Sequence, residues 1–500
     1  MVPRSRHGRW TPGTALRLLT AAFALLAAGC ATNPVSGRRE FNLVSAGQEE
    51  KMGREGYKAV LAEYGAYDDS TVQKYVTGVG LKLAKVTPLP DIDWHFTVID
   101  DPSVNAFAMP GGYIYITRGI MAHLNSEAQL AGVLGHEVGH VTARHTARQI
   151  TSEQVAGVGL LVGSIVSPAL ARYGGVAQQA LGLMFLGYSR DHETQADDLG
   201  IQYMTRAGWD PREMPATYHM LRRVGDRTGA RLPTFMSTHP DPGDREARTR
   251  TLAQSAVTGR TGLAVNADAY LDHIEGLVFG PDPRHGYFVN SQYFNPDLKL
   301  QIILPPGWAY HDSRSALIAA APDEHSGLQI SGADGKDQTP AGQVSALLAK
   351  GEISGPEGGA ETIGGHAAWV GRLTVNSKGG PGGRLLAAFV SWSPDLMLEI
   401  LGSGGVTEES LILSSIRSLR DLTDPRALAR KPDRVKVMRA PAAGVFSALV
   451  PLLIPPPGAQ GIGLEETAIL NNLISTEPVA AGHVLKVIEA GQPKPSASAQ

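Results

Sequence analysis

The sequence predicts an α+β chain: a mostly helical domain with a small sheet, then a smaller α+β domain, then a small C-terminal unit. Apolar residues recur at helical spacing in the first half, and only one short stretch there is typical of a hairpin. Beyond Pro281-Asp282-Pro283 the chain becomes rich in Gly, Pro and alternating strands. We place the domains at residues 30–260, 285–422 and 433–490, after a leader at 1–29 and before a low-complexity tail at 491–500 that we expect to be disordered.

The leader has the pattern of a lipoprotein signal peptide. Four arginines within the first 17 residues precede an uncharged run at 18–28 and then Gly29-Cys30. Cys30 is the single cysteine of the chain, so internal disulfides are excluded and lipidation is its best explanation. The alternative is a simple secretory peptide that ends near a cysteine. Ala31, where Asp would retain a Gram-negative lipoprotein at the inner membrane, predicts a periplasmic protein held at the outer membrane by its lipid.

A hairpin is expected at residues 105–117. Residues 113–117 are strand formers, and Pro110-Gly111-Gly112 before them is a turn signal. An edge strand in this hairpin could bind an extended peptide through main-chain hydrogen bonds. The alternative is a sheet that only supports the following helix.

That helix carries His136-Glu137-Val138-Gly139-His140. Ser126 and Gln129 form a predicted capping box at its start, and apolar residues continue at helical spacing to residue 141. Residues four apart differ by about 40° around a helix, so the two imidazoles share one face and can share a metal. Glu137 lies beside that face, where its carboxylate can take a proton from water. The alternative, an ordinary helix with two solvent-facing histidines, leaves titratable groups unpartnered in an apolar helix.

A third metal ligand is available at Glu193. It stands one helical turn before Asp197 and completes a His-His-Glu set with a fourth position open, as in catalytic zinc sites. Asp197 can accept the free N–H of a ligand imidazole. By itself this run could be a solvated acidic helix end. The uncharged segment 154–171 separates the two halves of the site, which must lie on one side of any membrane, so a single span is excluded. A buried helix, a re-entrant loop or an apolar lid over the cleft would fit this segment. We favour a helix and a flexible loop near the site, with Gly174-Gly175 as a hinge.

These motifs together resemble metallopeptidase family forty-eight, zinc endopeptidases that include CAAX prenyl endopeptidases and bacterial periplasmic quality-control proteases. Residues 105–116, 136–140, 193–197, 33–38 and Thr238-His239-Pro240 with Arg245 carry the resemblance, which covers roughly residues 31–255. Gln195 departs from the pattern, because the family often has Glu there.

The resemblance implies a gluzincin-type domain with one Zn²⁺ per chain. It assigns His136, His140 and Glu193 as ligands, Glu137 as the general base, and Asp197 as the partner of a ligand. The family also implies that His239 stabilises the oxyanion, or in a resting state occupies the open zinc position. Arg245 would orient His239 or a nearby carboxylate, or contact substrate, and Asn105 and Ala106 are the expected substrate contacts.

The remaining domains carry no predicted catalytic set. Strands at 298–302, 384–392 and 397–401 and a helix at 408–419 are expected in residues 285–422, as a substrate-recruiting or partner-binding module. Residues 433–490 weakly resemble a LysM-type glycan-binding module. The usual Gly-Asp-Thr is missing and a proline run at 455–457 interrupts it, which disfavours peptidoglycan binding; a packing extension is the alternative.

Two functions fit the sequence. One is a zinc endopeptidase that removes misfolded or misassembled cell-envelope proteins, with the outer-membrane assembly machinery as a further partner. The other is a chaperone-like, client-binding lipoprotein with a self-inhibited zinc site. A net charge of -3 and the absence of any Lys/Arg run give no reason to expect nucleic-acid binding.

Overall fold

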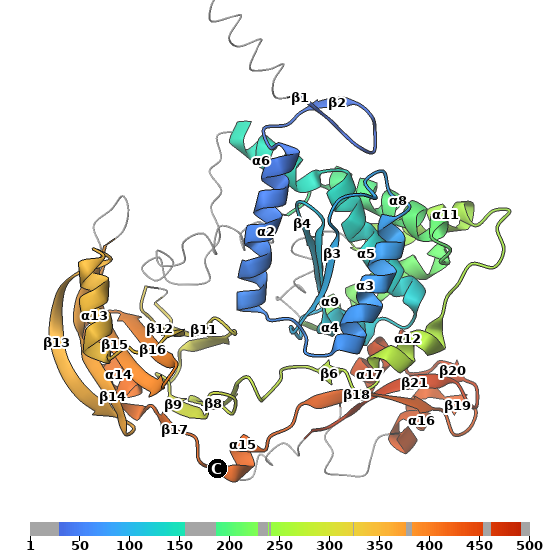
Figure 1. The fold of residues 1–500 in the computed structure, drawn as a ribbon. Helices are drawn as coiled ribbons and strands as arrows, with labels where there is room; N and C mark the ends of the chain where they lie inside the picture. Colours follow the sequence, from blue (N-terminus) through green and yellow to red (C-terminus); the bar gives the residue numbers. More distant parts are fainter. Residues whose placement is uncertain are drawn as a thin grey trace, which may run out of the picture.

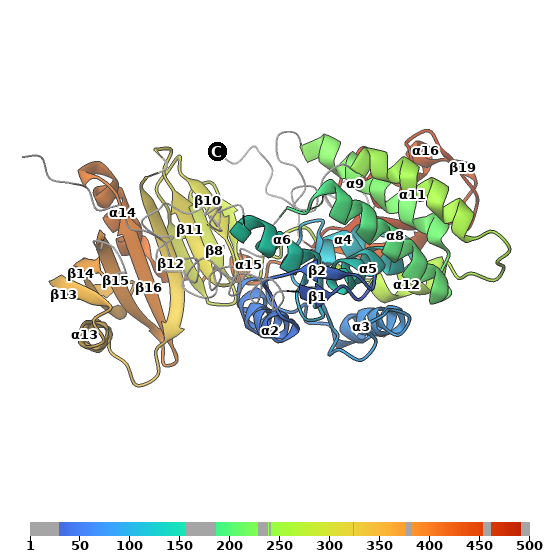
Figure 2. The same cartoon turned by 90° about the horizontal axis from the view of Figure 1, so that it is seen from above.

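The computed structural model describes residues 30–155, 187–228, 239, 242–323, 325–376, 383–453 and 462–491. The predicted α+β class is confirmed: a mostly helical domain lies beside a sheet-rich domain, and the C-terminal unit packs below the helical one (Figures 1 and 2). The leader and the tail from residue 492 lie outside the described residues, and so do the segment 154–171 from residue 156 onward and the predicted hinge Gly174-Gly175.

The helical domain is built from long helices around one three-stranded sheet. Its elements are β1 (Cys30–Thr32), β2 (Arg39–Phe41), α2 (Ala46–Glu63), α3 (Ser70–Ala84), β3 (His95–Ile99), β4 (Ala106–Met109), β5 (Tyr113–Thr117), α4 (Arg118–His123), α5 (Glu127–Thr142), α6 (His145–Val155), α8 (Arg190–Arg206), the 3-10 turn η3 (Pro211–Glu213), α9 (Met214–Thr228), α11 (Pro242–Ala256) and α12 (Ala267–Ile274).

The sheet confirms the predicted hairpin. β4 and β5 pair antiparallel, and the turn between them places Gly111 at φ 82° and Gly112 at φ 97°, a region that favours glycine. β3 pairs parallel to β5, so the strand order is β3-β5-β4 and β4 lies at an edge. The predicted capping box forms only in part. Ser126 accepts the amide of Gln129, but the Gln129 side chain accepts the amide of Asn125, one residue further back.

Helices α5 and α8 approach closely through glycines. A Cβ on Gly139 would stand 3.1 Å from the carbonyl oxygen of Ala196, and a Cβ on Gly135 would stand 3.2 Å from that of Gly200. These distances are tighter than ordinary packing, so a side chain at either position would require the facing helix to shift by a few tenths of an ångström. It brings the two predicted halves of the metal site face to face.

The middle domain has a seven-stranded antiparallel sheet with a helix on each face. Alternate residues of the interior strand β15 face opposite sides: Leu386 and Ala388 pack toward α14, and Ala387 and Phe389 toward α13. The predicted strands and helix are confirmed within a few residues. The elements are β7 (Tyr287–Val289), β8 (Gln292–Asn295), β9 (Leu300–Ile303), β10 (Ala309–Asp312), β11 (Ala316–Ala320), β12 (Gly327–Asp334), α13 (Pro340–Ala349), β13 (Ile353–Ile363), β14 (His366–Val375), β15 (Arg384–Ser393), β16 (Leu396–Ser403), α14 (Val406–Ser418), β17 (Arg420–Asp421) and α15 (Pro425–Leu428).

The C-terminal unit packs on the helical domain. Its strand β18 (Asp433–Arg439) pairs with β21 (Val484–Glu489) and, on its other side, with β6 (Val278–Phe279). The remaining elements are β19 (Gly444–Val445), α16 (Phe446–Leu453), α17 (Leu464–Leu470) and β20 (Pro478–Val479). Buried Lys486 donates to the carbonyls of Ala122 at 2.7 Å and Leu124 at 2.6 Å. The middle domain is therefore inserted between two segments that share one core. The LysM resemblance stays a prediction.

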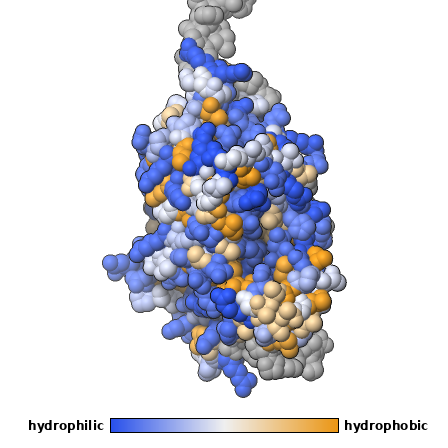
Figure 3. Space-filling model, turned by 90° about the vertical axis from the view of Figure 1, so that its right-hand side faces the viewer, coloured by the Kyte–Doolittle hydropathy of each residue, from blue (hydrophilic) through white to orange (hydrophobic). Residues whose placement is uncertain are grey.

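The face of the molecule that carries α11 and α12 is mainly hydrophilic, with apolar side chains in small groups (Figure 3). Among the described residues, no helix combines the length and the apolar composition that crossing a membrane requires.

Candidate metal centre

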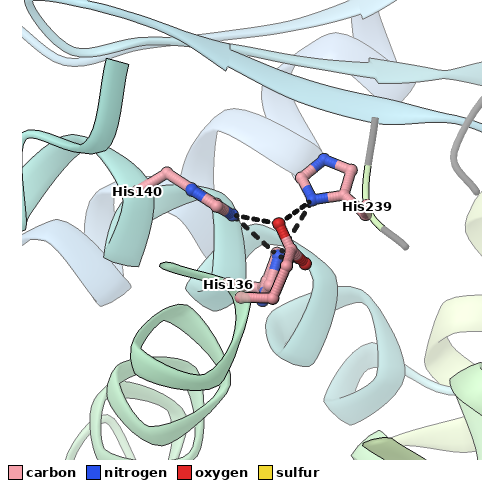
Figure 4. Close-up of side chains that lie close together, drawn as sticks. His136, His140 and His239 are labelled. Atoms are coloured by element: carbon pink, nitrogen blue, oxygen red, sulfur yellow. Dashed lines mark hydrogen bonds and ion pairs between the residues drawn. The ribbon is translucent and has the colours of Figure 1, made fainter. Parts of the chain in front are cut away.

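Four buried side chains converge between α5 and α8. His136 and His140 come from α5, Glu193 comes from the first turn of α8, and His239 lies on the segment before α11. The three imidazoles turn their nitrogens toward one point (Figure 4). Nε2 of His140 lies 3.0 Å from Nε2 of His136, which lies 3.4 Å from Nδ1 of His239. The Glu193 carboxylate lies 3.5 Å from each of the first two rings and 2.9 Å from His239.

This donor set fits a tetrahedral zinc ion. Bonds of about 2.0–2.2 Å to nitrogen and oxygen place the ligand atoms of a tetrahedral site about 3.3 Å apart. Five donor separations of 2.9–3.5 Å bracket that value, and all four ligand atoms lie within 4.8 Å of one another. His239 supplies the fourth donor, so the described side chains could enclose a metal entirely with protein ligands.

Asp197 and Arg245 hold His136 in place. Nδ1 of His136 lies 3.0 Å from the Asp197 carboxylate, which directs the Nε2 lone pair toward the other donors. The Arg245 guanidinium contacts Asp197 at 2.6 and 2.9 Å and Glu193 at 2.6 Å. Tyr218 completes the cluster by donating to Asp197. Arg245 thus spans both carboxylates of α8.

Glu137 stands beside the four donors without a close partner. It is fully buried, and neither of its carboxylate oxygens accepts a hydrogen bond from the described residues. The nearest basic nitrogen among the described residues is Nε2 of His239, which lies 3.7 Å from Oε1 of Glu137. Burial raises the pKa of Glu137, which moves a carboxylate toward the range suited to a general base.

Burial, neighbouring charges and hydrogen bonds shift the pKa values of the other titratable groups in the site. Burial opposes ionisation of Glu193 and Asp197, but the Arg245 guanidinium and, for Glu193, His239 outweigh it and hold both pKa values below the usual range. Burial also disfavours a charged His136, yet hydrogen bonds with Asp197 and Glu193 raise its pKa to about 9 in the metal-free protein. Burial lowers the pKa of His140. The site therefore keeps its carboxylates ionised, as metal ligation requires.

Comparison with known proteins agrees with this geometry. Residues 70–253 match the description "Peptidase family M48". The chain contains an M48 peptidase domain. The mitochondrial metalloendopeptidase OMA1 of Schizosaccharomyces pombe is 33% identical over 42% of this chain and 63% of that protein. The OMA1 of Arabidopsis thaliana is 35% identical over 39% and 41%, and the Beta-barrel assembly-enhancing protease of Escherichia coli K12 is 30% identical over 44% and 47%. The match spans less than two thirds of each relative's length.

Similarity to solved structures is weak. A solution structure of cyanobacterial PsbP from Synechocystis covers 27% of this chain and 94% of its own at 14% identity and a TM-score of 0.22.

The second candidate ligand, His140, contacts a histidine that the sequence analysis did not single out. Nδ1 of His140 lies 2.9 Å from Nδ1 of His145, and Nε2 of His145 lies 3.0 Å from the side-chain oxygen of Gln195. His145 begins α6, which starts just after Arg144 at φ 57°. The signal available in the sequence was a third histidine five residues after His140. Its orientation depends on the left-handed Arg144, which the helical period does not predict.

The predicted peptide contacts lie at the start of the edge strand. Asn105 and Ala106 are both buried, and the side-chain oxygen of Asn105 has no hydrogen-bond partner among the described residues. A substrate contact by Arg245 stays a prediction, since the contacts given above place its guanidinium on the two carboxylates. Cys30 begins β1, but its side chain lies outside the described part, so lipidation also stays a prediction.

Proposed function

We propose that this chain is a zinc-dependent endopeptidase that hydrolyses peptide bonds of misfolded or misassembled cell-envelope proteins. The observation that carries the proposal is one buried group of four possible metal donors beside a buried carboxylate, Glu137, that accepts no hydrogen bond from the described residues. Bound zinc would polarise the scissile carbonyl and lower the pKa of a water. Glu137 would take the proton of the attacking water and pass it to the leaving amine. His136, His140 and Glu193 would hold the metal.

The edge strand β4 supports binding of extended peptides. A peptide that pairs with its free edge would be recognised through main-chain hydrogen bonds, with little sequence preference. Asn105 adds a buried side-chain oxygen that could accept a substrate amide. Such recognition suits unfolded clients, because their backbone is accessible.

His239 favours a second candidate, a client-binding protein with a closed metal site. Its Nδ1 lies 2.9 Å from Glu193 and 3.4 Å from His136, which is the distance range of a fourth ligand. Four protein ligands are typical of structural zinc, whereas catalytic zinc keeps one position open. We therefore propose that His239 holds the resting enzyme latent and, once displaced, stabilises the oxyanion.

The leader and the bacterial relative support a place in the cell envelope. The lipoprotein pattern at 1–29 with Cys30 predicts a lipid anchor and a periplasmic domain held at the inner face of the outer membrane, near its assembly machinery. The Escherichia coli relative is named for β-barrel assembly, whereas two other relatives are named mitochondrial. We propose outer-membrane proteins in assembly as the substrate class.

Casein cleavage by the purified protein tests the function. We expect one tightly bound zinc per chain, slow cleavage by the native protein and none by Glu137→Gln. Faster cleavage by His239→Ala would support the latency role of His239, and slower cleavage would support its oxyanion role. Equal cleavage by the native protein and Glu137→Gln would refute the hydrolase. If no variant cleaves casein or an unfolded outer-membrane protein while all of them bind it, the client-binding function replaces it.

A further inference from the structure

The ring of His140 needs a hydrogen-bond partner at Nδ1, the nitrogen that faces away from the other metal donors. Its Nε2 faces the other donors, 3.0 Å from His136 and 3.5 Å from Glu193. A nitrogen that ligates a metal must present a lone pair, so the proton of the neutral ring sits on Nδ1. The ring is 1% exposed, and water therefore cannot accept that proton.

His145 is placed to accept it. Its Nδ1 lies 2.9 Å from Nδ1 of His140, and it is the one hydrogen-bond partner of that nitrogen among the described residues. Two imidazole nitrogens at this distance can share only one proton, so Nδ1 of His145 is the acceptor and its own proton is on Nε2. The two rings meet edge to face, with centroids 4.9 Å apart and an interplanar angle of 76°.

Gln195 and Arg148 determine which tautomer His145 adopts. Nε2 of His145 lies 3.0 Å from the Gln195 side-chain oxygen, and Nη1 of Arg148 donates to the same oxygen at 3.2 Å. Because a guanidinium can only donate, the Gln195 atom between them is the carbonyl oxygen and not the amide nitrogen. That oxygen can only accept, which places the His145 proton on Nε2 and leaves its Nδ1 free to accept from His140.

We propose that His145 is a positioning residue of the metal centre: it accepts the Nδ1 proton of His140, and Gln195 locks it in the tautomer that can do so. The inference rests on the proposed role of His140 as a ligand. It gives the two ligand histidines different supports. His136 contacts the ionised Asp197, whereas the hydrogen bonds of His140 run through two neutral side chains, His145 and Gln195.

Zinc affinity measured by competition with a chromophoric chelator tests the proposal on the full chain. We expect His145→Phe, which keeps the ring volume, and Gln195→Met to weaken binding by about 10–100-fold, the range of second-shell losses. Gln195→Glu keeps the acceptor oxygen and should restore near-native affinity. The Co²⁺-loaded protein gives a second readout, since a misoriented His140 changes the visible absorption of the bound ion.

A matched control separates positioning from packing. His192 stacks on His145 at a centroid distance of 4.4 Å, without a hydrogen bond to it, so His192→Phe should bind zinc as the native protein does. If Gln195 acts through His145, the double variant His145→Phe/Gln195→Met binds no more weakly than His145→Phe alone.

The outcomes distinguish this inference from the function proposed above. If the native protein binds no zinc, the metal site itself fails. If the native protein binds zinc and His145→Phe and Gln195→Met bind it equally well, only the positioning role is overturned. Losses in Gln195→Glu as large as in Gln195→Met, or additive losses in the double variant, would also overturn it. If His145→Phe does not fold, the comparison of Gln195→Met with Gln195→Glu tests the positioning role by itself.

Discussion

Replacing Arg245 by Met should destabilise the metal-free protein by about 4 kcal/mol, because it leaves two buried carboxylates without their cation. Glu193 is 2% exposed and Asp197 is fully buried, and the guanidinium contacts them at 2.6 Å each. Removing one partner of a buried ion pair typically costs about 3–5 kcal/mol. Asp197 keeps its contact with His136, which holds the expected loss below twice that cost.

The loss should depend on pH. Against the effect of burial, His239 and Arg245 hold the pKa of Glu193, and Arg245 holds the pKa of Asp197, below the ordinary range. A lowered carboxyl pKa contributes stability above its unfolded value, near pH 4, and that stability is lost as the pH falls through the folded value. The difference between native protein and Arg245→Met is therefore largest near neutral pH and shrinks in acid, where the freed carboxylates become protonated.

Urea unfolding followed by circular dichroism at pH 7.5 and pH 4 measures this difference. Arg250→Met is the matched control, because Arg250 lies on the same helix in an exposed pair with Glu246 and should cost only about 0.3–0.5 kcal/mol. Equal unfolding free energies for the two variants at pH 7.5 would refute the reasoning. Zinc should narrow the Arg245→Met deficit, since a cation beside Glu193 replaces part of the lost charge.

Three further predictions concern packing and burial. Lys486→Ala should lower the free energy of unfolding by about 3 kcal/mol or more, because it leaves a cavity and two buried carbonyls without a donor. The control is Lys436→Ala, an exposed position on the same sheet, which should change the free energy of unfolding little. Gly139→Ala should destabilise the protein and weaken zinc binding, because the added methyl group separates α5 from α8. Gly78→Ala lies in open space on α3 and should stabilise the protein by up to about 1 kcal/mol. Thermal unfolding of both variants measures whether the two changes in stability have opposite signs. Burial raises the pKa of Asp312 to about 7, so stability should fall as the pH rises from 4 to 7, by at most about 1.4 kcal/mol per pH unit. Asp312→Asn should abolish this slope in pH-dependent denaturation, and an unchanged slope would contradict the assignment.

Patterns among residues close in the chain were sufficient to predict the candidate ligand pair, His136 and His140, and most of the secondary structure. His136 and His140 share a face because the helical period places residues four apart together. The hairpin before them follows from turn chemistry at Pro110-Gly111-Gly112, and the strands of the middle domain follow from alternation. Such features depend on residues close in the chain, so the sequence alone determines them.

Packing decided what completes the site. His239 lies 103 residues from His136, and it reaches the other donors only because the fold returns the chain there. The meeting of α5 with α8 depends on glycines that face each other across the interface, and the support of His140 depends on the left-handed Arg144. The C-terminal unit rejoins the first domain through Lys486, across a whole inserted domain. The sequence by itself thus predicts the residue types of the candidate metal centre and, through the family resemblance, names His239. Only tertiary contacts place His239 beside the other three donors, because contacts between distant segments follow from close packing and not from local period.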